Sequence, residues 1–182
     1  MTTEAIKIIC DTREPWPHPW ARWLPSHVQI ERATLETGDF ALAGLPDGAV
    51  VERKTVSDFH GCVTSNRERF ERELARSRYV GRFVVVVEGS LFDCIDGSGG
   101  PSEASLIGTV AAWSRRFCPI IFAGDERHAA VLAWRYLAGQ ITEGHRIIRA
   151  AERETAGVAT AEGHLAIASK KNVPLPVHRA CF

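Results

Sequence analysis

The chain has 182 residues, of which 45% are hydrophobic and 24% charged, a composition typical of a globular domain with a substantial core. Its 22 basic residues balance 22 acidic ones, so it lacks the overall positive charge of many nucleic-acid-binding proteins. No apolar run approaches the roughly 18 residues that a membrane-spanning helix needs. The N-terminus also lacks the pattern of a signal peptide. The five scattered cysteines form no CxxC pair, which favours reduced thiols in the cytoplasm, including the nucleoid or a nucleus.

The first third of the chain predicts short strands separated by turns. Apolar runs, turn residues and a Pro-Asp-Gly turn place the expected elements as follows: a buried strand over 6–10 that ends at Asp11, a short helix over 20–24, a strand over 28–35, a strand over 38–42, a turn over 45–48 and a strand over 49–54. The last two strands are expected to form a hairpin. Trp16, Trp20 and Trp23 are expected to pack as a cluster.

The remainder alternates helices with strands. A helix is expected over 56–78 with a break near 64–66, and Phe70 and Leu74 give its second half a buried stripe. The following elements are a central strand over 83–87, a helix over 102–117 capped by Ser102, a strand over 119–122 and a helix over 125–149. This alternation predicts a single mixed α/β domain over 1–149. Residues 150–182 are expected to form a C-terminal tail, either extended or partner-binding.

An arginine-rich segment lies between Arg67 and Arg82. It holds six arginines against three glutamates. One interpretation is a solvated amphipathic helix with Glu–Arg pairs four residues apart. The other is a surface that contacts an anionic partner.

The sequence VVERKTVSD, residues 50–58, carries the candidate chemistry. Side chains alternate across a strand, so Glu52 and Lys54 share one face and Arg53 points to the other. The hairpin brings Asp39 near this pair, and Asp11 ends a strand that could reach the same end of the sheet. Carboxylates with a lysine suit Mg²⁺-assisted phosphodiester hydrolysis. The spacing alone is also compatible with an ordinary charged strand end.

Three elements together resemble the nuclease domain of the XPF/Hef family. They are Asp11-Thr12-Arg13-Glu14, Gly38-Asp39, and the run from Glu52 to Asp58 that matches E-R-K-x-x-x-D. The resemblance extends over about residues 6 to 140. It implies a restriction-endonuclease-like fold, an α/β domain whose mixed central sheet is flanked by helices.

The resemblance also implies roles for individual residues. Asp39 and Glu52 would bind Mg²⁺ or Mn²⁺, Asp11 would add a carboxylate at the metal, and Lys54 would be the catalytic lysine. For Asp58, capping the next helix is an equal alternative to a direct role. Residues implied to support the site or to contact DNA are Arg13, Glu14, Arg53, Asp58 and Arg67.

The function implied is a metal-dependent endonuclease acting on branched or flapped DNA in repair or recombination, as a homodimer formed through the nuclease domain. The chain departs from the family in lacking room for a tandem helix-hairpin-helix DNA-binding module in its last thirty residues or so. Two alternatives remain open: a non-catalytic scaffold subunit of a nuclease heterodimer, and an RNA-directed nuclease with the same chemistry.

Overall fold

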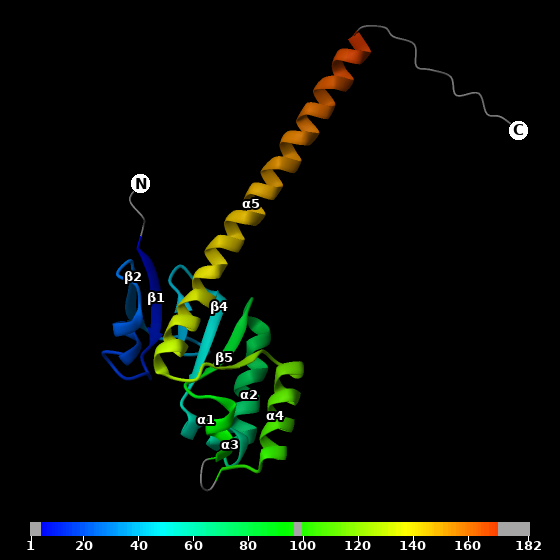
Figure 1. The fold of residues 1–182 in the computed structure, drawn as a ribbon. Helices are drawn as coiled ribbons and strands as arrows, with labels where there is room; N and C mark the ends of the chain where they lie inside the picture. The colour runs from blue at the N-terminus through cyan, green and yellow to red at the C-terminus, as the bar shows by residue number, and fades with distance from the viewer. Residues whose placement is uncertain (1–4, 97–99, 171–182) are drawn as a thin grey trace, which may run out of the picture. The chain divides into compact units, whose positions relative to one another are not determined.

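The computed structural model describes residues 5–96 and 100–170. The chain divides into two compact units, Met1–Ile141 and Thr142–Phe182. The first unit contains all the strands of the described part and is built on one six-stranded sheet (Figure 1). The expected class, a mixed α/β domain, is confirmed.

The sheet has the order β2-β1-β3-β4-β5-β6. Its strands are β1 (Ile6–Asp11), β2 (Val28–Ala33), β3 (Phe40–Leu42), β4 (Leu45–Lys54), β5 (Phe83–Val87) and β6 (Ile120–Phe122). Strand β3 runs antiparallel to both β1 and β4, whereas the pairs β1–β2, β4–β5 and β5–β6 are parallel. The end of β1, the start of β3 and the ends of β4 and β5 therefore meet at the same end of the sheet.

The helices are η1 (Pro19–Trp23), α1 (Val56–Val63), α2 (Arg67–Arg76), η2 (Ser77–Tyr79), α3 (Leu91–Asp96), α4 (Glu103–Arg116) and α5 (Glu126–Lys170). Ser102 caps α4, as expected, by accepting a hydrogen bond from the backbone N–H of Ser105. The break between α1 and α2 also falls where the sequence places it.

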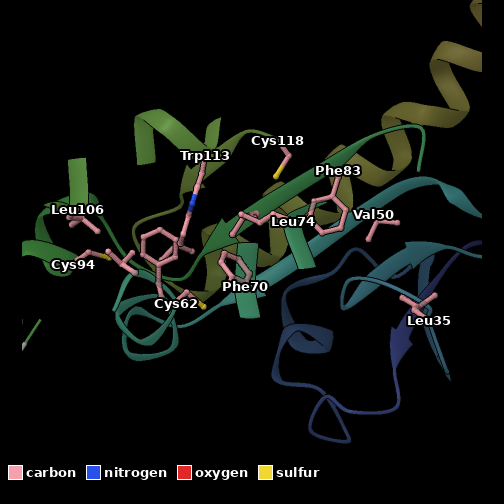
Figure 2. Close-up of a cluster of buried hydrophobic side chains, with 14 of the residues drawn as sticks. Leu35, Val50, Cys62, Phe70, Leu74, Phe83, Cys94, Leu106, Trp113 and Cys118 are labelled. Carbon is pink, nitrogen blue, oxygen red and sulfur yellow. The ribbon is translucent and has the colours of Figure 1, made fainter. Parts of the chain in front are cut away.

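Two hydrophobic clusters cover the two faces of the sheet. Helices α1 to α4 pack on one face, where Figure 2 shows Phe70, Leu74 and Trp113 among the buried side chains. Helix η1 and the start of α5 pack on the other, through Trp20 and a run of buried residues that ends at Leu137. Strand β5 contributes to both clusters, which explains why five consecutive apolar residues form it.

The hairpin turn lies elsewhere than expected. Leu45-Pro46-Asp47-Gly48 belongs to β4, and the turn is formed by Ala43 and Gly44. Gly44 has a φ of +82°, a left-handed conformation that glycine adopts without steric strain. The Pro-Asp-Gly signal was therefore misleading, because a glycine that closes a two-residue turn determines the register of these strands.

Two other expectations are corrected. The last helix continues to Lys170 instead of ending near Arg149, so the part of the expected tail up to Lys170 is helical. Residues 171–182 lie outside the described residues. Of the three N-terminal tryptophans only Trp20 is buried, whereas Trp16 and Trp23 are exposed, so they do not form one packed cluster.

Within the described residues, no helix is long and apolar enough to cross a membrane. The four cysteines of this part, Cys10, Cys62, Cys94 and Cys118, are all buried free thiols.

Candidate active site

Backbone pairing brings Asp39 beside the end of β4. The N–H of Asp39 donates to the carbonyl of Val51 (2.9 Å), and the carbonyl of Asp39 accepts from the N–H of Asp11 (2.8 Å). The N–H of Arg53 in turn donates to Asp39 Oδ2 (2.7 Å). Gly38 makes this approach sterically feasible, since its φ is +75° and a Cβ there would lie 2.1 Å from Val50 Cγ1.

Glu52 and Lys54 lie next to each other on the α1–α4 face of the sheet, as strand alternation predicts. Glu52 is buried, with 1% of its surface exposed, and its Oε1 accepts a hydrogen bond from Lys54 Nζ. Lys54 Nζ also lies 5.2 Å from the centroid of the Phe70 ring on α2. The second oxygen of Glu52, Oε2, is buried without a hydrogen-bond partner in the described part of the protein.

The two carboxylates are electrostatically unfavourable in their ionised forms. Burial raises the pKa of Glu52 to about 8, and the negative charge of Asp39 adds to the rise. Burial likewise raises the pKa of Asp39 to about 6, against the opposing effect of Lys54. Burial alone would lower the pKa of Lys54, but Glu52 and Asp39 raise it, so the lysine is a cation. An additional cation at this point would stabilise both carboxylates.

The residues present fit a divalent metal ion. Asp39 and Glu52 offer hard oxygen ligands, and the unpartnered Oε2 of Glu52 is a buried acceptor that a cation would satisfy. In the residues that the structure describes, no three His, Cys, Asp or Glu side chains cluster as metal ligands. A two-carboxylate site leaves the other coordination positions to water and phosphate, which is usual for Mg²⁺.

Asp11 is occupied by other interactions. Its Oδ1 accepts from the N–H of Arg13 (2.9 Å) and from Arg13 Nε, and its Oδ2 accepts from the N–H of Leu35 (2.7 Å). Burial alone would raise the pKa of Asp11, but these hydrogen bonds lower it overall. The carboxylate thus ties the end of β1 to the loop before β3, and its role as a metal ligand stays a prediction.

Arg53 organises the opposite face of the sheet. Its guanidinium forms a bidentate ion pair with the Glu88 carboxylate, through Nε and Nη2 (2.8 Å each). Its Nη1 also donates to Glu14 Oε2 (3.2 Å). Trp20 donates its indole N–H to the same Glu88 (2.6 Å), and His18 contacts Glu14 (3.1 Å). Arg53 and Glu14 therefore support the strand that carries Glu52.

Asp58 and Arg67 have structural contacts. The N–H of Asp58 donates to Thr55 Oγ1, and Thr55 in turn donates to the Asp58 carboxylate (2.8 Å), which caps α1. Arg67 donates to Thr109 on α4 (2.9 Å), pairs with Glu71 and lies over the Trp113 ring, so it ties α2 to α4. A role in catalysis or DNA contact for either one stays a prediction.

The sequence reasoning did not identify two residues near the site. Glu88 directly follows the apolar run of β5, a position at the same strand end as Lys54 that could have indicated it. Glu73 on α2 lies close enough for its charge to raise the pKa values of both Asp39 and Glu52, after the larger effects of burial. Its place three residues after Phe70, on the next turn of the helix, was the available signal.

Comparison with known proteins identifies a family model and a related sequence that match most of this chain. The family model of the ERCC4 domain matches residues 11–132. A Methanocaldococcus jannaschii protein whose assigned name is that of an ATP-dependent RNA helicase is 34% identical over 128 residues, which are 70% of this chain and 15% of that protein. This chain therefore spans only a small part of that relative.

The fold is similar to that of XPF from Aeropyrum pernix. One structure of that protein is matched with a TM-score of 0.59 and 23% identity over 72% of this chain and 60% of XPF. A second, titled as a complex with DNA, is matched with a TM-score of 0.62 and 22% identity over 76% of this chain and 66% of XPF. With its fold and its sequence signature in agreement, this chain belongs to the ERCC4 domain family.

Proposed function

We propose that the chain is a Mg²⁺- or Mn²⁺-dependent endonuclease that hydrolyses phosphodiester bonds in branched or flapped DNA, as expected of a repair or recombination nuclease. The observation that carries the proposal is Glu52, a buried carboxylate with an unpartnered oxygen, held between Asp39 and Lys54. Burying such a group without a hydrogen-bond partner is unfavourable, and cation binding would compensate for it.

The proposed reaction is in-line attack of water on the phosphorus atom. The water oxygen forms a new P–O bond as the bond to the leaving oxygen breaks, which yields a phosphate monoester and a hydroxyl group. Asp39 and Glu52 would hold the metal ion, which when bound polarises the phosphate and increases the acidity of water. Lys54 Nζ, a cation at this site, would stabilise the negative charge that develops on the phosphate oxygens.

Substitution at Glu52 and Lys54 tests this function. We expect Glu52→Gln and Lys54→Ala each to reduce cleavage of forked and flapped DNA in Mg²⁺ by roughly 100-fold or more, a typical loss for electrostatic groups of an active site. Gel assays of forked, flapped and linear substrates in Mg²⁺, Mn²⁺ or EDTA would measure the rates. The matched controls, Glu36→Gln and Lys7→Ala, change an exposed carboxylate and an exposed lysine outside the site and should cut at the parental rate.

Each outcome of these assays is informative. Parental rates for both site variants, or cleavage by the parent that persists in EDTA, would contradict the proposal. Calorimetric titration with Mn²⁺ distinguishes the nuclease from the non-catalytic scaffold. A scaffold would bind DNA but would show no Mn²⁺ binding that depends on Asp39 and Glu52. Faster cleavage of matched RNA substrates would instead favour an RNA-directed nuclease.

Homodimerisation through the nuclease domain, which the resemblance to the XPF/Hef family implies, belongs to the same proposal. Light scattering coupled to size-exclusion chromatography would measure it, with a monomer at micromolar concentration as the contradicting result.

A further inference from the structure

Three arginines of α2 point away from the protein. Arg69, Arg72 and Arg76 are exposed, and in the described part of the chain no hydrogen bond or ion pair holds their guanidinium groups. Their spacing of three and four residues places them along one face of the helix. We refer to these three residues as the arginine stripe.

The rest of α2 is occupied by packing. Phe70 and Leu74 are buried against the sheet, and Arg67 with Glu71 flanks them on the side of α4. Of the Glu–Arg pairs that the sequence could form four residues apart along α2, Arg67 with Glu71 is the ion pair found among the described residues. The helix therefore directs Arg67 toward α4 and leaves the arginine stripe without hydrogen-bond or ion-pair partners among the described residues.

The first part of the arginine stripe lies beside the candidate active site. Phe70, which follows Arg69 directly, has the Lys54 ammonium over its ring, and Glu73, between Arg72 and Arg76, is within electrostatic reach of Asp39 and Glu52. Cys62 gives a second indication: burial raises its pKa to about 11, and the positive charges of Lys54 and Arg69 oppose the rise. The part of α2 from Arg69 to Glu73 thus lies near the site, and Arg76 continues the arginine stripe toward the C-terminal end of the helix.

We propose that the arginine stripe binds the phosphate backbone of duplex DNA whose scissile bond lies at Glu52 and Lys54. Arg69 and Arg76 are seven residues apart, about 10 Å along a helix, which is close to the axial rise of three base pairs. Exposed guanidiniums without internal partners can contact phosphates without breaking any bond of the protein. The inference rests on the proposed nuclease function and supplies a DNA contact within the domain itself.

The test is the salt dependence of DNA binding. The full chain carrying Glu52→Gln, which would not cut the probe, is compared with and without Arg69→Gln, Arg72→Gln and Arg76→Gln together, in EDTA, on a fluorescent duplex. Loss of three phosphate contacts should make the negative slope of the log association constant against log salt concentration shallower by about 2 to 3. It should also weaken binding roughly tenfold or more at 0.1 M salt. Glutamine is helix-compatible, so circular dichroism and melting temperature should be unchanged.

A matched control removes the same charge elsewhere. Arg115→Gln, Arg116→Gln and Arg135→Gln together neutralise three exposed arginines of α4 and α5 and should leave the slope near the parental value. An unchanged slope in the stripe variant, an equal loss in the control, absence of DNA binding by the parent, or tighter binding of a matched RNA duplex would each overturn the inference. A parent that binds DNA through the arginine stripe but does not cut it would contradict the nuclease function alone.

Discussion

Glu52 shows how this fold places an unfavourable group where it is chemically useful. Its carboxylate is buried, with Lys54 as partner for one oxygen and none for the other in the described residues. A buried carboxylate of this kind has a raised pKa because burial disfavours the charged form. Asp11 is the contrasting case, since its two oxygens accept hydrogen bonds and its pKa is lowered. Asp11 and Glu52, two buried carboxylates at the same end of the sheet, thus have pKa values shifted in opposite directions.

The raised pKa of Glu52 predicts a pH-dependent stability. In the folded state the group binds a proton up to a pH of about 8, above its ordinary pKa of 4.5, so its contribution to stability is lost as the pH rises through 8. Glutamine stays neutral at every pH. We therefore expect Glu52→Gln to increase the free energy of unfolding in EDTA at pH 9 by about 2 kcal/mol, less than the full pKa displacement implies because Lys54 loses a partner.

Urea unfolding of the parent and Glu52→Gln proteins at pH 4, 7 and 9 would measure this difference. The stability gained by Glu52→Gln should shrink toward pH 4, where glutamate at position 52 is neutral like glutamine. Mn²⁺ should stabilise the parent more than the variant at pH 7. A variant less stable than the parent at pH 9 in EDTA would contradict the prediction.

At the scale of the elements, two glycines around the β3–β4 hairpin have different reasons for being glycine. Gly38 precedes β3, where it has a positive φ and a Cβ would collide with buried Val50. Gly44 closes the turn with a positive φ but has open space around it. The first glycine is needed for both conformation and packing, and the second for conformation alone.

This difference predicts unequal costs of substitution. Gly38→Ala should lower the free energy of unfolding by about 3 kcal/mol or more, because Val50 is buried and cannot move aside. Gly44→Ala should lower it by about 1 kcal/mol, the approximate penalty of a left-handed residue with a Cβ. Chemical denaturation of both variants would compare them, and equal losses would show that the collision at Gly38 relaxes.

At the scale of the whole chain, the buried side chains of α5 among those that the structure describes, residues 126–153, lie in the first part of the helix. Those given as buried in this helix run from Ala129 to Leu137, within the unit Met1–Ile141. The sheet with its two hydrophobic clusters is complete within that unit. Helix α5 continues past residue 149 to Lys170, so no helix end marks the expected division of the chain there. That division stays a prediction.

Truncation after Arg149 tests this division. We expect residues 1–149 to fold with a melting temperature within about 2 °C of the full chain, since the sheet and both hydrophobic clusters lie within Met1–Ile141. The same melting experiment with Mn²⁺ should show equal stabilisation of both proteins. A loss of more than about 5 °C, or aggregation of the shorter protein, would show that later residues contribute to the core.

The sequence by itself determined the α/β class, most of the elements and the sharing of one strand face by Glu52 and Lys54. Strand alternation and helical periodicity are local properties of the chain, so they follow from spacing alone. The expected hairpin placed Asp39 near Glu52 and Lys54, and the backbone register confirms this proximity, whereas the joint role of Asp39 and Glu52 as metal ligands came from the resemblance and stays a prediction.

Only the tertiary structure decided how the other charged residues are used. Asp11 has its hydrogen bonds with Arg13 and Leu35, and Arg67 joins α2 to α4. The contacts of Asp11 with Leu35 and of Arg67 with Thr109 join residues more than twenty positions apart, and the second also depends on the rotation of α2 about its axis. Sequence spacing specifies neither the packing partner of a helix nor the direction in which a long charged side chain leaves it, so the partners of these residues could not be predicted.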